Sequence, residues 1–313
     1  MERDVVMREV GLRDGIQGIT DFVETEDKLR WIRAEADAGM PEIEVTSYVP
    51  PKLLPQFADA EAVTRESLSV VGLKVAALIP NIKGAQRGFE LGVHKLNFVM
   101  SVSETHNQKN VRRSRETSLE EFRSIVASAR EIPSHKRPVI CGGLATALGC
   151  SYEGKIEISE VVRWTVALLE AGADELIIPD TVGYAAPALV KQVFRAVLAE
   201  AGDIPVAAHF HDTRGTGLAN LAAALETGVR HFDASLGGMG GCPFAPGASG
   251  NIVMEDAVYM LESMGLRTGI DIEKLIGVRD VVTKSLPNLR LDGAISRAGL
   301  PRGFSPATAS AAA

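Results

Sequence analysis

The sequence predicts an α/β protein in which eight parallel strands close into a (β/α)₈ TIM barrel. Eight apolar runs of strand length recur along the chain, and helix-like segments lie between them. The runs are nearly continuous in apolar residues, which is typical of strands buried on both faces of a parallel sheet. The count of eight favours the closed barrel over its alternative, an open doubly wound sheet.

Each predicted strand is a short apolar run, and several of the runs end at polar residues or glycine. We expect the strands at residues 5–12, 42–49, 74–80, 95–103, 138–146, 175–183, 205–212 and 231–238.

The segments between the strands carry apolar residues three and four positions apart, which predicts amphipathic helices. Several begin with Ser or Thr shortly before an acid and end at Ala-Gly or Thr-Gly, which are capping signals. The clearest of these helices are expected at residues 25–40, 118–132, 158–173, 188–203 and 216–230.

The chain continues past the eighth strand with a glycine-rich stretch at 237–251. Helical patterns follow at 252–265 and 271–285, and we expect both helices to pack beside the barrel. No linker divides the chain, so residues 1–300 are predicted to form a single domain. The ending at 301–313 is low in complexity and is predicted to be a disordered tail.

Composition excludes several classes of function. The net charge of −7 and an aromatic content of 5% argue against a surface that binds nucleic acid. No uncharged apolar stretch reaches the ~18 residues of a membrane span, and the amino-terminal residues lack the layout of a signal peptide. The 3 cysteines are scattered, which does not resemble a disulfide framework. We therefore expect a cytoplasmic protein without a membrane partner.

Polar side chains cluster where predicted strands end, and the carboxyl ends of barrel strands are where catalytic residues gather. Arg13 and Asp14 follow the first strand, either as functional residues or as a solvated loop. Glu44 lies inside an apolar strand and needs a partner, at the site or in a pair with a lysine between helices. Asp180 ends the sixth strand, and Thr181 can form a hydrogen bond beside it.

His209 and His211 are spaced to place both side chains on one face of the seventh strand. With Asp14 they would provide two imidazoles and one carboxylate, which suits Mn²⁺ or Mg²⁺ with open positions. The alternative is a pair of hydrogen-bonded core histidines.

Glycines in 237–251 allow a mobile flap that carries Cys242 over the site, where its thiol could donate or accept a proton. The alternative is a plain glycine-rich turn with a buried thiol.

Eight stretches carry a more specific signal, in order along the chain. They are REVGLRDGIQ (8–17), IEVTSYVPPKLLPQFAD (43–59), QKNVRRS (108–114), LGCSYEGKI (148–156), DTVG (180–183), HFHDT (209–213), GGMGGCPFAPGASGN (237–251) and EDAVYMLESMG (255–265). Together they resemble the 3-hydroxy-3-methylglutaryl-CoA lyase family, a group of metal-dependent TIM-barrel lyases.

The resemblance implies roles for individual positions. It makes Asp14, His209, His211 and Asn251 the ligands of Mg²⁺ or Mn²⁺. It implies that Arg13 polarises the thioester carbonyl. Glu44 and Asp180 become acids that border the metal and the substrate, and Cys242 becomes the flap cysteine. The resemblance also makes Asn110 an active-site asparagine, and substrate contacts are expected for Arg13, Gln17, Ser47, Asn110, Thr181 and Arg214.

The family reaction implied is a retro-Claisen cleavage of a tertiary 3-hydroxyacyl-CoA, with 3-hydroxy-3-methylglutaryl-CoA giving acetoacetate and acetyl-CoA. A base among Asp14, His209 and His211 takes the hydroxyl proton, and the metal lowers the pKa of that hydroxyl. Arg13 faces the thioester enolate that forms. His209 or Cys242 then protonates the enolate carbon.

Two departures from the family pattern concern the substrate. Arg214 and Thr216 stand where these lyases usually carry Tyr and Gln, and LGCSYEG differs from the usual Cys-Pro. An added cation could favour another carboxylate arrangement, so citramalyl-CoA is an alternative substrate.

Two further readings are a condensing acyl-CoA synthase and a non-catalytic acyl-CoA-binding barrel. The condensing synthases carry extra C-terminal domains, for which this chain has no room. Homologous barrels often pair through helices, so we expect a homodimer.

Overall fold

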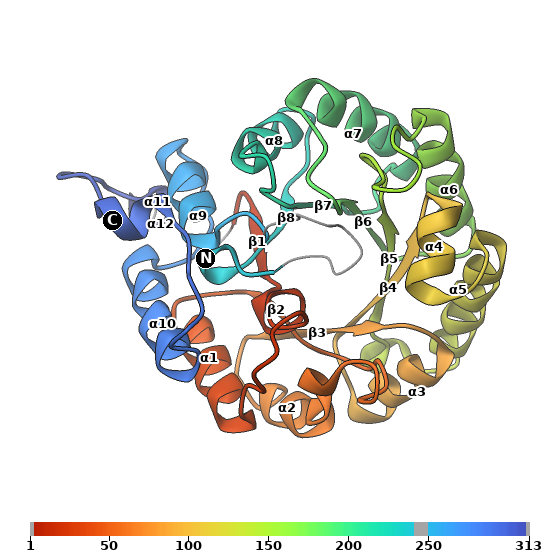
Figure 1. The fold of residues 1–313 in the computed structure, drawn as a ribbon, viewed down its shortest axis with the longest axis horizontal. Coiled ribbons are helices and arrows are strands. Elements are labelled where there is room, and N and C mark those ends of the chain that lie inside the picture. The colour runs from red at the N-terminus through yellow and green to blue at the C-terminus, as the bar shows by residue number, and fades with distance from the viewer. Residues whose placement is uncertain (1–2, 241–249, 311–313) are drawn as a thin grey trace.

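The computed structural model describes residues 3–240 and 250–310, and its centre is a closed eight-stranded barrel (Figure 1). Every strand pairs in parallel with its neighbours in chain order, and β1 also pairs with β8, which closes the sheet. The predicted (β/α)₈ barrel is confirmed, and the open sheet is excluded. The strands are β1 (Val6–Glu9), β2 (Glu42–Ser47), β3 (Lys74–Ile79), β4 (Lys95–Ser101), β5 (Val139–Ala145), β6 (Glu175–Asp180), β7 (Val206–Phe210) and β8 (His231–Ala234).

Helices form a ring outside the barrel (Figure 1). The five predicted helices are present, and three further ones, α2, α3 and α4, accompany them. The apolar faces of these helices, except the mostly polar α4, pack on the outer face of the strands, so the core lies between the two layers as well as inside the barrel. The helices are α1 (Thr25–Asp37), α2 (Ala60–Ser67), α3 (Ile82–Leu91), α4 (Glu104–Val111), α5 (Arg115–Arg130), α6 (Ile158–Glu170), α7 (Pro187–Ala201) and α8 (Gly217–Leu225).

The carboxyl-terminal helices pack beside the barrel, as predicted. Helix α10 (Ile272–Ser285) lies against α1, where the Asp271 backbone N–H donates to the Ala38 carbonyl at 2.8 Å. Helix α9 (Met254–Ser263) lies next to α10, and the short helices α11 (Ala294–Ala298) and α12 (Ala307–Ser310) follow.

The chain beyond residue 300 contacts α9. The rings of Phe304 and Tyr259 lie 5.1 Å apart, and the Thr308 backbone N–H donates to Glu262 at 2.7 Å. The disorder expected for 301–313 remains a prediction.

Charged side chains fill one layer of the barrel interior, a feature that the apolar pattern did not predict. On one side, Arg8 Nε donates to Asp233 Oδ1 at 2.6 Å. On the other, Lys95 Nζ donates to Glu42 at 2.9 Å and to Glu175 at 2.5 Å, and Arg8 also binds Glu175. All five side chains are buried. Burying a charge is costly, and mutual pairing offsets that cost.

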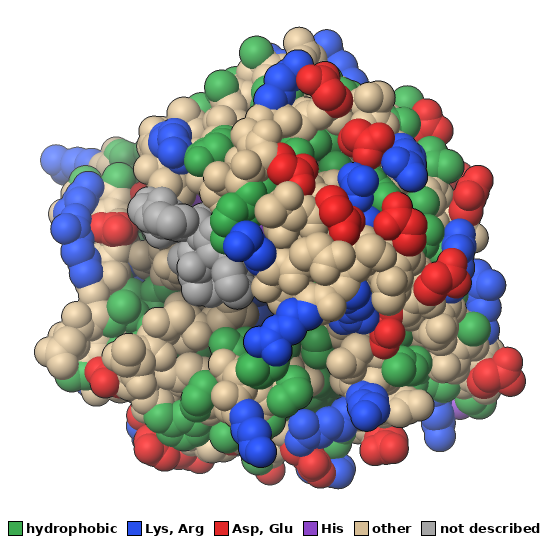
Figure 2. Space-filling view, turned by 45° about the vertical axis from the view of Figure 1, so that its right-hand side comes forward, with side chains coloured by type: hydrophobic (Ala, Val, Ile, Leu, Met, Phe, Trp, Pro, Cys, Tyr) green, Lys and Arg blue, Asp and Glu red, His purple; other side chains and the backbone are tan. Residues whose placement is uncertain are grey.

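The face of the molecule shown in Figure 2 is mixed in charge. Basic and acidic side chains are interspersed on it and form no continuous basic field. No described helix has both the length and the apolar character needed to cross a bilayer.

Candidate metal centre and active site

Asp14, His209 and His211 converge at the carboxyl ends of β1 and β7. Strand β1 runs into the helical turn η1 (Gly11–Gly15), which carries Asp14, and the two histidines lie at the end of β7 and just beyond it. The Nε2 atoms of the histidines are 3.1 Å apart, and His211 Nε2 is 3.5 Å from Asp14 Oδ2. All three side chains are buried, and among the described residues no other group meets the geometry of a metal site.

The donor atoms of this cluster fit a divalent cation. Two imidazole nitrogens that face each other at 3.1 Å need a proton or a cation between them, because neutral imidazole offers only one N–H. Asn251 offers a further oxygen donor: its Nδ2 donates to Asp14 Oδ2 at 2.7 Å and to the Met239 carbonyl at 2.9 Å, which leaves Oδ1 without a protein partner in the described chain. Mixed imidazole and oxygen donors suit Mn²⁺ or Mg²⁺.

The backbone at Gly240 passes directly over these donors. A Cβ atom there would lie 2.5 Å from Asn251 Nδ2 and 3.1 Å from Asp14 Oδ2, and the φ angle of +130° also favours glycine. The described chain on both sides of 241–249 therefore contacts the metal cluster. Cys242, predicted as the flap cysteine, lies outside the described residues.

Glu9 connects the loops that follow β1 and β8. Its carboxyl group accepts the backbone N–H of Gly11 at 2.5 Å and that of Leu236 at 3.0 Å. Burial and the neighbouring Glu35 carboxyl raise the pKa of Glu9 well above its ordinary value. One buried side chain thus positions the turn that carries Asp14 and the start of the glycine-rich stretch.

Arg13 lies between Asp14 and Glu44. Its Nη1 donates to Asp14 Oδ1 at 2.7 Å and its Nε binds Glu44, whose other oxygen accepts from Asn97 Nδ2 at 2.8 Å. Glu44 therefore faces the barrel interior, and the alternative of a lysine pair between helices is wrong. Burial alone would raise the pKa of Asp14, but Arg13 and His211 bring it below its ordinary value, so Asp14 is a carboxylate.

Asp180 organises the loop after β6. Its two oxygens accept the backbone N–H groups of Tyr184 at 2.9 Å and Ala185 at 3.0 Å. Burial raises the pKa of its carboxyl group. Thr181 accepts the backbone N–H of Thr146 at 2.8 Å, which ties this loop to the end of β5.

Arg214 binds the same loop. Its Nη1 donates to the carbonyls of Gly183 at 2.9 Å and Val182 at 3.1 Å, and its guanidinium lies 4.4 Å from the ring centroid of Tyr184. Thr216 Oγ1 donates to the Ala185 carbonyl at 3.1 Å. The two residues that depart from the family pattern therefore both hold the loop after β6.

The remaining predicted substrate contacts are spread around the barrel mouth. Ser47 is buried at the end of β2, and Gln17 is half-buried just after η1. Asn110 is exposed on α4. Asn107, one turn earlier, is buried instead, and its side chain ties α4 to the end of β4 by accepting the Ser101 backbone N–H at 2.9 Å.

Sequence reasoning missed two polar residues near the cluster, Asn97 and Asp233. Asn97 holds Glu44, and Asp233 Oδ2 lies 3.2 Å from His209 Nδ1. Both are buried within apolar strands, the same signal that singled out Glu44. Applied to every strand, that signal would have found them.

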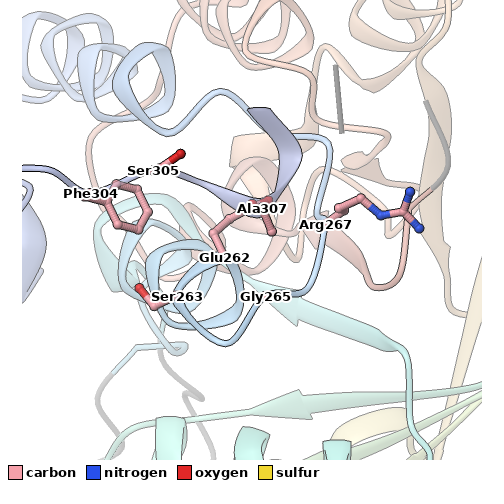
Figure 3. Close-up of a pocket in the computed structure, with 7 residues that line it drawn as sticks. All are labelled: Glu262, Ser263, Gly265, Arg267, Phe304, Ser305 and Ala307. Atoms are coloured by element: carbon pink, nitrogen blue, oxygen red, sulfur yellow. The ribbon is translucent and has the colours of Figure 1, made fainter. Parts of the chain in front are cut away.

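A separate pocket of about 640 Å³ lies at the carboxyl-terminal helices (Figure 3). It is lined by residues of α9, of the loop that follows it and of the segment before α12, among them Glu262, Arg267 and Phe304. None of its lining residues belongs to the metal cluster, so this pocket is not the candidate active site.

A closed β/α barrel that gathers such donor groups at the carboxyl ends of its strands is typical of metal-dependent barrel enzymes. The model of the HMGL-like family matches residues 4–282. The chain therefore belongs to the HMGL-like family, as the resemblance implied, and it is a carbon–carbon lyase.

Curated relatives are similar over most of their length. The chain is 41% identical to hydroxymethylglutaryl-CoA lyase YngG of Bacillus subtilis, over 92% of this chain and 97% of that protein. It is 37% identical to the mitochondrial hydroxymethylglutaryl-CoA lyase of Mus musculus, over 91% of this chain and 87% of that protein.

Two solved structures are also similar to this chain, at different levels of sequence identity. An HMG-CoA lyase from Acinetobacter baumannii, in complex with coenzyme A and 3-methylmalate, superposes with a TM-score of 0.90 at 38% identity, covering 96% of this chain and 97% of that one. The carboxyl transferase domain of Rhizobium etli pyruvate carboxylase, at 17% identity and a TM-score of 0.69, shares the fold alone; it covers 94% of this chain and 50% of that one.

Proposed function

We propose that this lyase cleaves 3-hydroxy-3-methylglutaryl-CoA into acetoacetate and acetyl-CoA with the help of a divalent cation. The observation that carries the proposal is the contact between Arg13 and Asp14, at 2.7 Å, which places a partly buried cation beside the candidate metal ligands. The names of the relatives support this substrate, and the coenzyme A bound to the Acinetobacter baumannii enzyme supports an acyl-CoA.

Different residues of the chain have different roles in the proposed reaction. Asp14, His209, His211 and Asn251 would hold the cation, which supplies the charge that polarises the substrate hydroxyl and carboxylate. One member of the Asp14, His209 and His211 cluster accepts the hydroxyl proton. Arg13 faces the thioester oxygen, where negative charge develops as the carbon–carbon bond breaks.

The paired carboxylates keep Arg13 in place for this task. Its guanidinium is held by Glu44 on one side and Asp14 on the other, and Glu44 is fixed in turn by Asn97. A group that is held before the reaction needs no reorganisation when the charge appears, which is the basis of electrostatic catalysis.

A coupled assay of the purified protein tests the proposal. With Mn²⁺ or Mg²⁺ present, we expect equal amounts of acetyl-CoA and acetoacetate from 3-hydroxy-3-methylglutaryl-CoA. Citramalyl-CoA in the same assay tests the alternative substrate, and consumption of acetyl-CoA with a keto acid would reveal a condensing synthase. Absence of turnover with every acyl-CoA would support a binding barrel and contradict the proposal.

Three finer features belong to the same proposal. We expect Mg²⁺ or Mn²⁺ as the cation, since the donors are imidazole, carboxylate and amide oxygen. We also propose a cytoplasmic location, which the scattered cysteines support, and a homodimer. Light scattering after gel filtration measures the assembly.

Replacement of Arg214 by methionine tests how this residue affects substrate use. Methionine keeps an unbranched stem but loses the hydrogen bonds to Val182 and Gly183. Each such bond contributes about 0.5–1.5 kcal/mol net to the stability of the loop. Because Arg214 contacts the loop and not the reacting groups, only part of this loss should reach catalysis, and we expect kcat/KM to fall about 2- to 10-fold, or ~0.4–1.4 kcal/mol. Affinity for Mn²⁺ should not change. A changed ratio of kcat/KM between 3-hydroxy-3-methylglutaryl-CoA and citramalyl-CoA would instead show that the guanidinium selects the substrate carboxylate.

A further inference from the structure

A line of hydrogen bonds runs from the candidate metal ligand His209 into the charged layer of the barrel. His209 Nδ1 lies 3.2 Å from Asp233 Oδ2, and Asp233 Oδ1 accepts from Arg8 Nε at 2.6 Å. The sheet register explains the alignment, because Asp233 on β8 is the direct partner of His209 on β7 and of Arg8 on β1.

The three side chains that form this line of hydrogen bonds are all buried. His209, Asp233 and Arg8 are exposed by only 6%, 4% and 2%, so water does not compete for their polar atoms. Arg8 forms a buried ion pair with Asp233, in which its guanidinium donates to Oδ1 at 2.6 Å, and this pairing requires the charged form of the carboxyl group. Asp233 is therefore a carboxylate, which can only accept hydrogen bonds.

The carboxylate determines where His209 carries its proton. Because Asp233 can only accept, the hydrogen must lie on His209 Nδ1, and the lone pair then lies on Nε2. That Nε2 atom is the one that faces His211 Nε2 at 3.1 Å in the metal cluster. A carboxylate behind a metal-binding histidine commonly fixes both ring orientation and tautomer.

We propose that Asp233, oriented by Arg8, is a positioning residue that fixes His209 in the tautomer whose Nε2 is free to bind the cation. Arg8 occupies Oδ1, so only Oδ2 can face the histidine, and Arg8 is itself bound to Glu175. This inference rests on the proposed metal function, but it concerns Asp233, which contacts His209 at Nδ1, and not the metal ligands themselves.

The variant Asp233→Asn tests the tautomer directly. Arg8 donates, so it should bind the amide oxygen and turn the amide NH₂ towards His209 Nδ1. His209 would then have to accept at Nδ1 and carry its hydrogen on Nε2, where the cation binds. We expect Mn²⁺ affinity, measured by calorimetry or by electron paramagnetic resonance, to fall about 10- to 100-fold.

Glu42→Gln is the matched control. Glu42 belongs to the same buried layer and binds Lys95 at 2.9 Å, but no hydrogen bond joins it to His209 in the described chain. Both variants remove one carboxylate from this layer. If Asp233 acted only through the stability of the layer, the two variants would lose Mn²⁺ affinity alike.

The double variant Arg8→Met/Asp233→Asn tests the part played by Arg8. Without Arg8, the amide can turn its oxygen to His209 and restore the N–H on Nδ1, so we expect part of the lost Mn²⁺ affinity to return. Affinity as low as in Asp233→Asn would overturn the role of Arg8.

Nitrogen-15 spectra of metal-free protein labelled at its 6 histidines give a readout that needs neither cation nor substrate. We expect the hydrogen of His209 on Nδ1 in the unsubstituted protein and on Nε2 in Asp233→Asn. The His209 signals can be assigned by comparison with His209→Gln. Hydrogen on Nε2 in the unsubstituted protein, or unchanged Mn²⁺ affinity in Asp233→Asn, overturns the inference. A protein that has the expected tautomer but binds no Mn²⁺ contradicts the proposed metal function alone.

Discussion

Replacing Arg13 by methionine is expected to lower kcat for acyl-CoA cleavage by roughly 10²–10³-fold, the usual cost of removing a group that stabilises developing charge. Methionine keeps most of the apolar stem and removes the guanidinium that binds Asp14 and Glu44. The loss should fall on kcat more than on KM, because the charge on the thioester oxygen is larger in the transition state than in the substrate. Steady-state rates of acetyl-CoA release measure both parameters.

The control for this variant is its affinity for Mn²⁺. Asp14 keeps its contact with Asn251 when Arg13 is replaced, so the cation should still bind. Glu44 loses its cationic partner and retains Asn97, which leaves a buried carboxylate with incomplete pairing. The double variant Arg13→Met/Glu44→Gln removes both charges and separates lost catalysis from a disturbed Glu44. Turnover within about tenfold of the original enzyme, with Mn²⁺ bound, would contradict the role of Arg13.

The barrel could be predicted because its strands are buried on both faces. Runs such as 74–80 and 205–212 are largely apolar over the length of a strand. This pattern can be recognised in the sequence without knowing which strands pair with one another. Helix α4 (Glu104–Val111) was not predicted, because its residues are mostly polar and show no apolar stripe. Helix α3 (Ile82–Leu91) contains two glycines, which weaken the helical signal.

The metal ligands could be predicted in part, because residues two apart on a strand share a face. That rule placed His209 and His211 together, and the structure brings Asp14 to them. The link to Asp233 depends on the register of β7 with β8, which no local pattern contains. Asn251 was identified from the family resemblance and not from a local sequence pattern. Its Oδ1 is left free because its Nδ2 binds Asp14 and Met239, and these contacts are visible only in the folded structure.

Side chains in the loops were the hardest to predict. Arg214 was expected to contact substrate as an added cation near the site, but its guanidinium binds the carbonyls of Val182 and Gly183. Asn110 was expected near the substrate and is exposed on α4. Which of several competing partners a long polar side chain takes depends on neighbouring loops, whose conformation is not periodic. Their substrate roles therefore stay proposals.

Removal of one metal ligand, by His211→Ala, is expected to abolish the Mn²⁺-dependent lyase activity and the stabilisation that Mn²⁺ provides. An ion at 100 times its Kd adds about 2.7 kcal/mol to the free energy of unfolding, so the original enzyme should show a higher Tm with Mn²⁺ than with a chelator. The variant lacks the Nε2 atom that faces both His209 and Asp14, so this rise in Tm should be lost. Thermal unfolding with and without Mn²⁺ measures the effect alongside the acetyl-CoA assay.

The matched control is His135→Ala, which removes an exposed histidine from the turn η3 (Ser134–Lys136) and should leave both the Mn²⁺-dependent rise in Tm and the turnover unchanged. Without a cation, His211 Nδ1 and Asn251 Oδ1 have no hydrogen-bond partner in the described chain, so the chelated enzyme keeps a buried polar cluster that is incompletely paired. Replacing His211 by alanine removes the unpaired Nδ1 together with the ring, and the chelated variant should therefore unfold at a temperature close to that of the chelated original enzyme. A Tm that rises equally with Mn²⁺ in both proteins would place the bound ion elsewhere in the molecule and contradict the assignment of His211 as a ligand.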